Sequence, residues 1–133
     1  MDYFSKNATM ILTFDSVDGP GKQIESPTFV DIENAILSLD GSSRTQVGMF
    51  FDEDTFVQVG GGSDLCKCSI RANGKLYVLI DPSLTENEYV WVVDGQGDEI
   101  PRNECFKATD VVRVVKLFWD KRRLSDEFAW KTF

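Results

Sequence analysis

Histidine is missing from this chain of 133 residues, and cysteines and basic side chains are scarce. Without histidine, the chain lacks the commonest general base and the commonest metal ligand in proteins. The three cysteines are an odd number with only one close spacing, so they build no disulfide framework and indicate a reducing compartment, the cytoplasm. No apolar run approaches the length of a membrane span, and the first residues carry no secretory signal. We therefore expect a cytoplasmic protein with no membrane partner.

Basic residues are outnumbered by acidic ones, 14 against 22, which gives a net charge of −8. Such a chain repels phosphate backbones, so we expect no nucleic-acid partner, and any charged partner should be basic. An acidic surface also serves plain solubility, and that interpretation stands beside the first. The charge is concentrated in residues 81–104, where seven acids accompany one base.

The side chains present indicate no reaction. Cys66 and Cys68 alternate onto one face of an expected strand with only Cys105 as a possible third thiol, so buried small side chains are favoured over a metal site. The acids between residues 94 and 99 stand in a turn, a setting that does not favour acid/base catalysis, and their spacing does not guarantee the ligands that a hard cation needs. We predict no enzyme activity, no catalytic residue, no metal and no cofactor.

Chain length and hydrophobic periodicity predict the fold. A chain of 133 residues with 42% hydrophobic content suits a single domain, residues 1–133. Apolar residues alternate in a first strand at residues 8–17 and with a period of two from residue 45 to residue 93, where Asn73-Gly74 marks a tight hairpin. The expected inward faces of this run include Val47, Met49 and Phe51, then Cys66, Cys68 and Ile70.

Two amphipathic helices flank the run of strands. The first spans about residues 28–39, begins near Ser26, Pro27 and Thr28, and has an apolar stripe; the second spans residues 108–122 with Thr109 as its cap. After it, Phe128, Trp130 and Phe133 are expected to close the edge of the core. The sequence predicts an α+β fold, a mainly antiparallel sheet with two amphipathic helices packed on it. The stripes are Phe29, Ile32, Ile36 and Leu39, then Val111, Val114, Val115, Phe118 and Trp119.

Residues 88–106 combine a stiff strand with an acidic break. Residues 89–93 are β-branched or aromatic, so they predict the next strand of the sheet, with Tyr89 and Trp91 in or near the core. Two glycines follow within residues 94–98, and Pro101 holds Ile100 extended. We expect an acidic loop at the surface that binds a basic partner. Its candidate contacts are Asp94, Gln96, Asp98, Glu99 and Glu104, and the competing acidic patch is Asp52, Glu53 and Asp54.

The order of features from residue 56 to residue 130 resembles the first-numbered family of immunity proteins of bacterial polymorphic toxin systems, the contact-dependent growth inhibition type. The resemblance covers more than half of the chain. Its most distinctive part is the glycine-glutamine turn followed by acid, hydrophobe and proline. The features are, in order, a strand, Gly60-Gly61-Gly62, the hairpin through residues 76–82, a strand, Asp94-Gly95-Gln96, Glu99-Ile100-Pro101, a helix with Phe118, and Trp130.

The resemblance implies an α+β protein encoded beside a toxin in bacteria. Such a protein binds the toxin's C-terminal effector domain in the cytoplasm of the producing cell and neutralises it. Effectors of these systems include nucleases and nucleic-acid deaminases, which are basic enough to hold nucleic acid. The alternative is a non-enzymatic adaptor or ligand-binding domain in which Tyr89, Trp91 and Trp130 line a groove.

Overall fold

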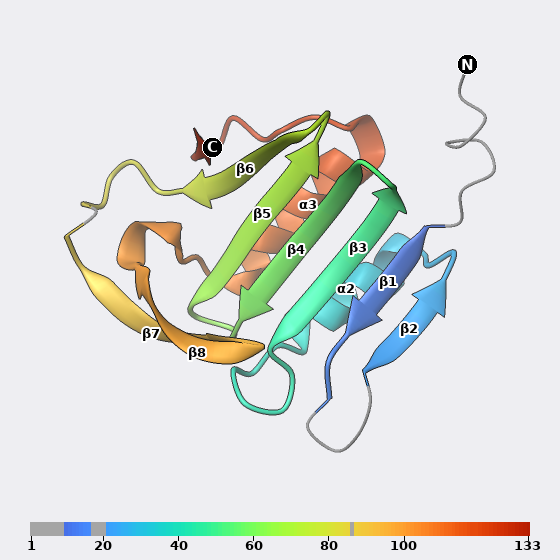
Figure 1. Cartoon of the computed structure of the whole chain (residues 1–133), viewed down its shortest axis with the longest axis horizontal. Coiled ribbons are helices and arrows are strands. Elements are labelled where there is room, and N and C mark those ends of the chain that lie inside the picture. Colours follow the sequence, from blue (N-terminus) through green and yellow to red (C-terminus); the bar gives the residue numbers. More distant parts are fainter. Residues whose placement is uncertain (1–9, 17–20, 86) are drawn as a thin grey trace.

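Seven strands hydrogen-bond side by side in the order β2-β1-β3-β4-β5-β6-β9, every pair antiparallel (Figure 1). This computed structural model describes residues 10–16, 21–85 and 87–133. Together with two helices on the sheet, it confirms the predicted α+β fold and its mainly antiparallel sheet. The strands are β1 Ile11–Phe14, β2 Lys22–Glu25, β3 Gln46–Asp52, β4 Thr55–Gly61, β5 Cys66–Ala72, β6 Lys75–Ile80 and β9 Ala129–Thr132.

Both helices, α2 (Phe29–Leu37) and α3 (Ala108–Lys121), cover the same face of the sheet and leave the other face open (Figure 1). The hydrophobic core lies between the two helices and the sheet, because alternate strand residues point at the helices. The predicted inward faces are confirmed. The buried residues of strands and helices that form this core include Leu12, Ile32, Ile36, Val47, Met49, Val57, Val59, Cys66, Cys68, Ile70, Leu79, Val111, Val114, Val115 and Phe118.

The two helices begin differently. Thr28 caps α2 in a capping box, in which Asp31 N donates to Thr28 Oγ1 at 3.3 Å and Thr28 N donates to Asp31 Oδ2 at 2.9 Å. The predicted cap Thr109 is wrong, since α3 starts after Lys107 with no side-chain cap. Its first free N–H, that of Ala108, donates instead to the carbonyl of Ser63 at 2.8 Å, so a neighbouring loop supplies the acceptor.

The Asn73-Gly74 turn is confirmed. Its two central residues have φ of 53° and 78°, the left-handed pair that this type of turn requires, and β5 and β6 pair on either side of it. At the ends of the sheet the sequence was less informative. The first strand, predicted at residues 8–17, is shorter in the structure and spans only β1; residues 8, 9 and 17 lie outside the described residues. Strand β2 was not predicted. In the tail, Phe128 and Trp130 pack on the core, but the prediction for Phe133 is wrong because it is 74% exposed.

The segment after β6 departs most from the prediction. Strand β7 (Tyr89–Asp94) does not join the main sheet, and the expected acidic loop is a strand, β8 (Gln96–Pro101), paired with β7 as a separate hairpin (Figure 1). Of the two glycines, Gly95 makes the turn with φ of 77° and Gly97 continues the strand. The short helix η1 (Arg102–Glu104) follows. No helix in the described residues is both long enough and apolar enough to span a bilayer.

Candidate functional site

The β7–β8 hairpin is fixed at its turn by one threonine of the main sheet. The Gly95 N–H donates to Thr45 Oγ1 at 3.0 Å, and the Thr45 hydroxyl donates in turn to Asp15 Oδ2. Burial alone would raise the pKa of Asp15. The hydroxyl of Thr45 and the backbone N–H groups of Thr45 and Gln46 nevertheless stabilise the carboxylate and hold its pKa below the ordinary value. A chain of hydrogen bonds therefore runs from a half-buried carboxylate to the tip of the hairpin.

Glycines at the end of β4 form the seat on which the hairpin rests. A side chain at Gly60 would place its Cβ 2.2 Å from Cγ of Asp94, and one at Gly61 would place its Cβ 3.1 Å from the buried Val92. Because both positions lack side chains, β7 comes down onto the sheet backbone. Oδ1 of Asp94 is buried there and has no hydrogen-bond partner within the described protein.

The far end of the hairpin is tied to the body by backbone hydrogen bonds. Arg102 N donates to the carbonyl of Glu88 at 2.7 Å, and Asp81 N donates to the carbonyl of Asn103 at 2.7 Å. The guanidinium of Arg102 also donates to the carbonyl of Cys105 at 3.0 Å. The hairpin is thus held at both ends while one of its faces stays open to solvent.

That open face is aromatic as well as acidic. Tyr89 is 57% exposed and Trp91 62% exposed, so the prediction that they are core residues is wrong. The reason is that β7 leaves the main sheet, where one of its faces would have been covered. Glu99 pairs with Trp91 across the hairpin, and the indole lies over the bare backbone of Gly97. Sequence reasoning missed this surface, although a glycine six residues after the tryptophan was the available signal.

The eight predicted contact residues fall in three places. Asp94, Gln96, Asp98 and Glu99 lie together on the hairpin, and all except Asp94 are exposed. Glu104 lies in η1, where its side chain is 13% exposed and its carboxylate is 3.9 Å from Nζ of Lys131. The structure therefore does not present Glu104 with the others.

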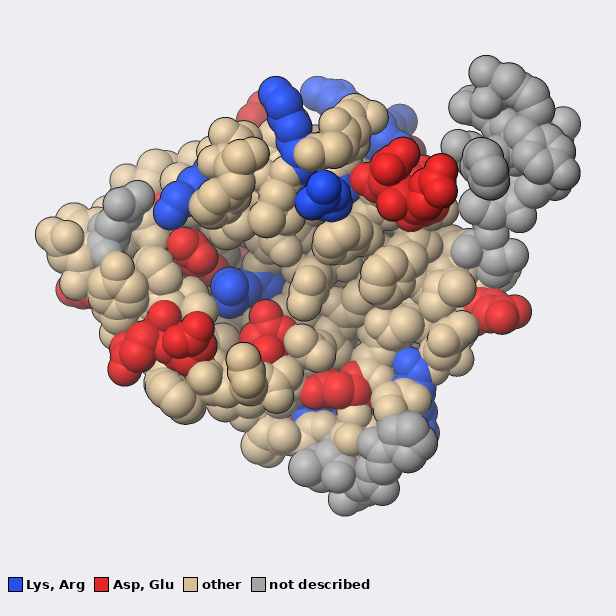
Figure 2. All heavy atoms as spheres, in the orientation of Figure 1, with Lys and Arg blue, Asp and Glu red and all other residues tan. Residues whose placement is uncertain are grey.

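The competing patch of Asp52, Glu53 and Asp54 forms the β3–β4 turn, with Asp54 N donating to Asp52 Oδ1 at 2.8 Å. This turn lies at the opposite end of β4 from the glycines that seat the hairpin. Figure 2 shows the two acidic groups apart, one over the hairpin at lower left and one at upper right, with mostly uncharged surface between them. Because the two acidic groups are separate, substitutions in one group can be tested for partner binding without changing the other.

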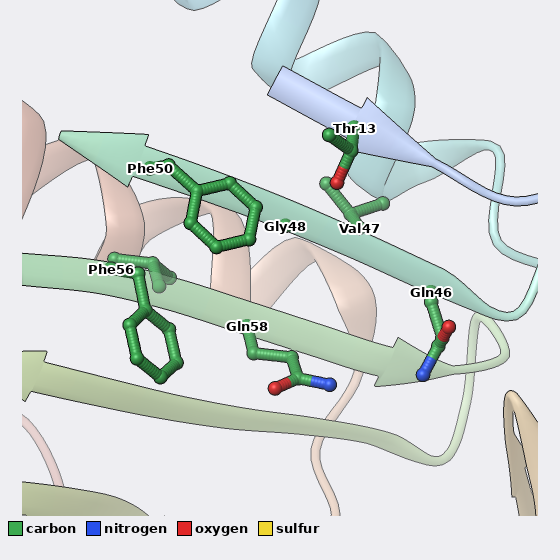
Figure 3. A pocket seen from close by; sticks show the side chains of 8 residues that line it. Thr13, Gln46, Val47, Gly48, Phe50, Phe56 and Gln58 are labelled. Carbon is green, nitrogen blue, oxygen red and sulfur yellow. The ribbon is translucent and has the colours of Figure 1, made fainter. Parts of the chain in front are cut away.

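A hollow of about 300 Å³ lies on the open face of the sheet, lined by residues of β1, β3 and β4 (Figure 3). Its floor is Gly48, and a Cβ there would come within 2.8 Å of Thr13 Oγ1 and 3.1 Å of the Phe50 ring. The rings of Phe50 and Phe56 lie 5.9 Å apart along one side, and Phe50 is 44% exposed. This hollow was also missed, yet Gly48 and Phe50 alternate with the inward Val47 and Met49, which places them outward.

Trp130, the third aromatic residue of the expected groove, lies elsewhere. It packs against the core from β9, and its indole N–H donates to the carbonyl of Ser125 at 2.8 Å. Tyr89 and Trp91 belong to the hairpin. The structure does not bring the three together.

The thiols have no reactive character. Cys66, Cys68 and Cys105 are free and buried. Burial raises the pKa of all three, that of Cys68 to about 12, and nearby Cys68 and Asp94 contribute further to the rise at Cys66. Across residues 10–16, 21–85 and 87–133, no three histidine, cysteine or acidic side chains gather closely enough to hold a metal ion.

Comparison with known proteins finds no protein-family model that matches this chain and no curated protein sequence that matches it.

Proposed function

We propose that this chain is an immunity protein of a bacterial polymorphic toxin system, which binds and neutralises the C-terminal effector domain of its cognate toxin in the cytoplasm of the producing cell. The observation that carries the proposal is the β7–β8 hairpin, which presents Glu99 on the same face as two exposed aromatic rings and Asp98 exposed on the adjoining position. The resemblance to immunity proteins covers the same residues. The opposed domain is of the nuclease or nucleic-acid deaminase type.

The hairpin has the composition of a protein-binding surface. Tyrosine and tryptophan are enriched at the energetic centres of interfaces, because they bury a large area at a small entropy cost. Tyr89 and Trp91 are large exposed hydrophobic side chains, and Asp98 and Glu99 stand on the paired strand. A basic partner supplies the complementary charge for those two carboxylates.

Neutralisation follows from the partner's own chemistry. An enzyme that handles nucleic acid has a basic groove, which attracts an acidic hairpin from a distance and speeds association. Once bound, a carboxylate such as that of Asp98 or Glu99 occupies a position meant for a phosphate. The hairpin is suited to this because both of its ends are already fixed, so little ordering is required on binding.

This function is binding without catalysis. The chain has no histidine, and its cysteines are buried with raised pKa values, so the commonest general base is missing and the thiols are inert. No cofactor or metal is needed for an electrostatic and aromatic interface.

The test is to produce this protein with the C-terminal domain encoded by the neighbouring toxin-like open reading frame. The two should purify as a complex, and the protein should abolish the domain's activity on nucleic acid and restore growth of cells that express the domain. Absence of a complex, or a complex in which the domain keeps full activity, would contradict the proposal. A non-cognate effector domain of similar charge is the control for unspecific attraction.

The hollow on the open face supports a second candidate, a non-enzymatic adaptor or ligand-binding domain. The rings of Phe50 and Phe56 and the bare floor at Gly48 form a groove separate from the hairpin. Substituting Gly48 by Ala adds a methyl group to this floor, where its nearest neighbours are Thr13 and Phe50 and not the hairpin. If that variant loses binding to a partner that the hairpin variants retain, the adaptor function is favoured.

A further inference from the structure

Trp91 is held flat as a platform. A Cβ built on Gly97 would lie 2.1 Å from Cζ2, 2.6 Å from Cε2 and 3.0 Å from Cη2 of the indole, so the ring covers the glycine backbone of β8 directly. The side chain is nevertheless 62% exposed. One side of the ring is therefore supported by the hairpin and the rest is open to solvent, and any side chain at position 97 would displace it.

A hollow of about 300 Å³ lies beside this ring, between the hairpin and the loops that follow α2 and β4. Among the described residues that line it, Asp40 and Asp64 supply carboxylates and none is basic. Glu99 does not line the hollow, but it pairs with Trp91 on the neighbouring strand, so its side chain lies on the same face of the hairpin as the indole. The site therefore offers an aromatic face and negative charge together.

Asp40 contributes negative charge to the hollow, but its carboxylate already accepts hydrogen bonds from its own loop. Its carboxylate accepts hydrogen bonds from the Ser43 hydroxyl at 2.6 Å and from the backbone N–H groups of Ser42, Ser43 and Arg44 at 2.9 to 3.0 Å. These bonds hold the pKa of Asp40 well below its ordinary value, so it is ionised at any physiological pH. Asp64 and Glu99 are exposed and free to accept hydrogen bonds from a bound group.

The combination fits a guanidinium group. Arginine is planar, stacks on indole rings and presents several donors in a fixed fork to carboxylates, whereas the ammonium of lysine is compact and more strongly hydrated. Anionic groups are excluded by the carboxylates. An apolar side chain would pack against the indole ring but would make no favourable interaction with the carboxylates.

We propose that the hollow beside Trp91 receives an arginine side chain of the basic effector domain, stacked on the indole and bonded to Asp64 and Glu99. This inference rests on the proposed function for its partner and deepens it, because it names the chemical group that the hairpin recognises. It also assigns Gly97 a role, which is to keep the platform flat.

The first test uses short peptides as probes of the intact protein. In a two-dimensional NMR spectrum the three tryptophan indole N–H groups give separate signals, and a Trp91→Phe variant identifies the signal of Trp91. An arginine-containing peptide should move that signal saturably and leave those of Trp119 and Trp130 in place. The lysine version should bind about two to five times more weakly, and the citrulline version, planar but neutral, should not bind.

Variants then locate the contact. Trp91→Leu, Glu99→Gln and Asp64→Asn should each weaken the arginine peptide about two- to fivefold, and Gly97→Ala should do the same by displacing the ring. Glu53→Gln, at the opposite end of the sheet, is the matched control and should bind as the parent does. The inference is overturned if the Trp91 signal does not move, if citrulline moves it equally, or if the variants bind like the control.

The second test uses the effector domain of the neighbouring open reading frame and separates the two proposals. If the parent binds the domain and Trp91→Leu binds it equally well, the arginine site is wrong and the proposed function stands. If the parent does not bind the domain, the proposed function is contradicted, and the peptide titration still decides whether the hollow is a guanidinium site. Weaker binding of the domain by Trp91→Leu and Gly97→Ala, but not by Glu53→Gln, supports both.

Discussion

The N–H of Gly95 and the hydroxyl of Thr45 meet at 3.0 Å although they are 50 residues apart in sequence. Thr45 is buried, and its hydroxyl also donates to Asp15. One side chain thus joins the hairpin turn to the start of the sheet.

Replacing Thr45 by Val should loosen this joint. The substitution keeps the shape but removes the hydroxyl, so the Gly95 N–H and one oxygen of Asp15 each lose a partner. We expect a loss of about 1 to 3 kcal/mol in the free energy of unfolding, measured with urea, and faster amide hydrogen exchange in β7 and β8. Thr132→Val, on an exposed position of β9, is the control. Unchanged exchange in the hairpin would show that Thr45 does not hold it.

Asp15 should make stability dependent on acidity. Its folded-state pKa lies below the ordinary value of 3.8, so its stabilising contribution is present above that value and is lost as pH falls through the folded-state pKa. Asp15→Asn removes the contribution. The stability gap between parent and variant should be constant above about pH 5 and should narrow below it. Unfolding midpoints across this range provide the measurement, and a gap that is the same at every pH would contradict the assignment.

The hairpin also shows where sequence reasoning stopped. Local signals gave the main sheet, because period-two alternation at Val47, Met49 and Ile70 and the Asn73-Gly74 turn depend only on neighbouring residues. The departure of β7 from the sheet depends on distant partners. No residue next to Val92 or Asp94 in the sequence indicates that these side chains will pack on Gly60 and Gly61. The exposed aromatic residues of β7 therefore could not be distinguished from core residues.

The same limit applies to the candidate site. The acidic group at Asp98 and Glu99 was identified from local charge, and the structure places both side chains exposed on the hairpin. Trp91 was misassigned because a tryptophan in an apolar run is usually buried. Glu104 was grouped with the others by sequence distance, whereas η1 turns it away towards Lys131.

Reversing Asp98 and Glu99 to Lys should slow association with the effector domain. We expect a cost of about 2 to 5 kcal/mol in binding if the carboxylates become buried in the interface, and under about 1 kcal/mol if they lie on its rim. The on-rate, the off-rate and their salt dependence are measured by surface plasmon resonance. Charge reversal on the effector domain should restore binding.

The control is the same reversal at Asp52, Glu53 and Asp54, at the other end of β4. Weakened binding in this variant alone would mean that the β3–β4 turn is the interface. Unchanged binding in both variants would exclude electrostatic recognition by either group.

The cysteines should matter for stability and not for binding. Replacing Cys66 and Cys68 with Ala leaves small cavities in the core and should cost about 1 to 3 kcal/mol in the free energy of unfolding. Binding of the effector domain should be unchanged. Because burial raises their pKa values, the native thiols should also resist alkylation until the protein unfolds. Rapid labelling of the native protein, or lost binding by a folded variant, would contradict this role.

The glycine seat at Gly60 and Gly61 has an evolutionary consequence. The hairpin meets the body through Asp94, Val92 and a threonine hydroxyl, while Tyr89, Trp91 and Glu99 contribute nothing to the buried core. Tyr89, Trp91 and Glu99 can therefore change from one lineage to another with little penalty in folding, provided that the seat is kept. Under the proposed function, the part of the molecule that must stay constant is separate from the part that can follow a changing toxin.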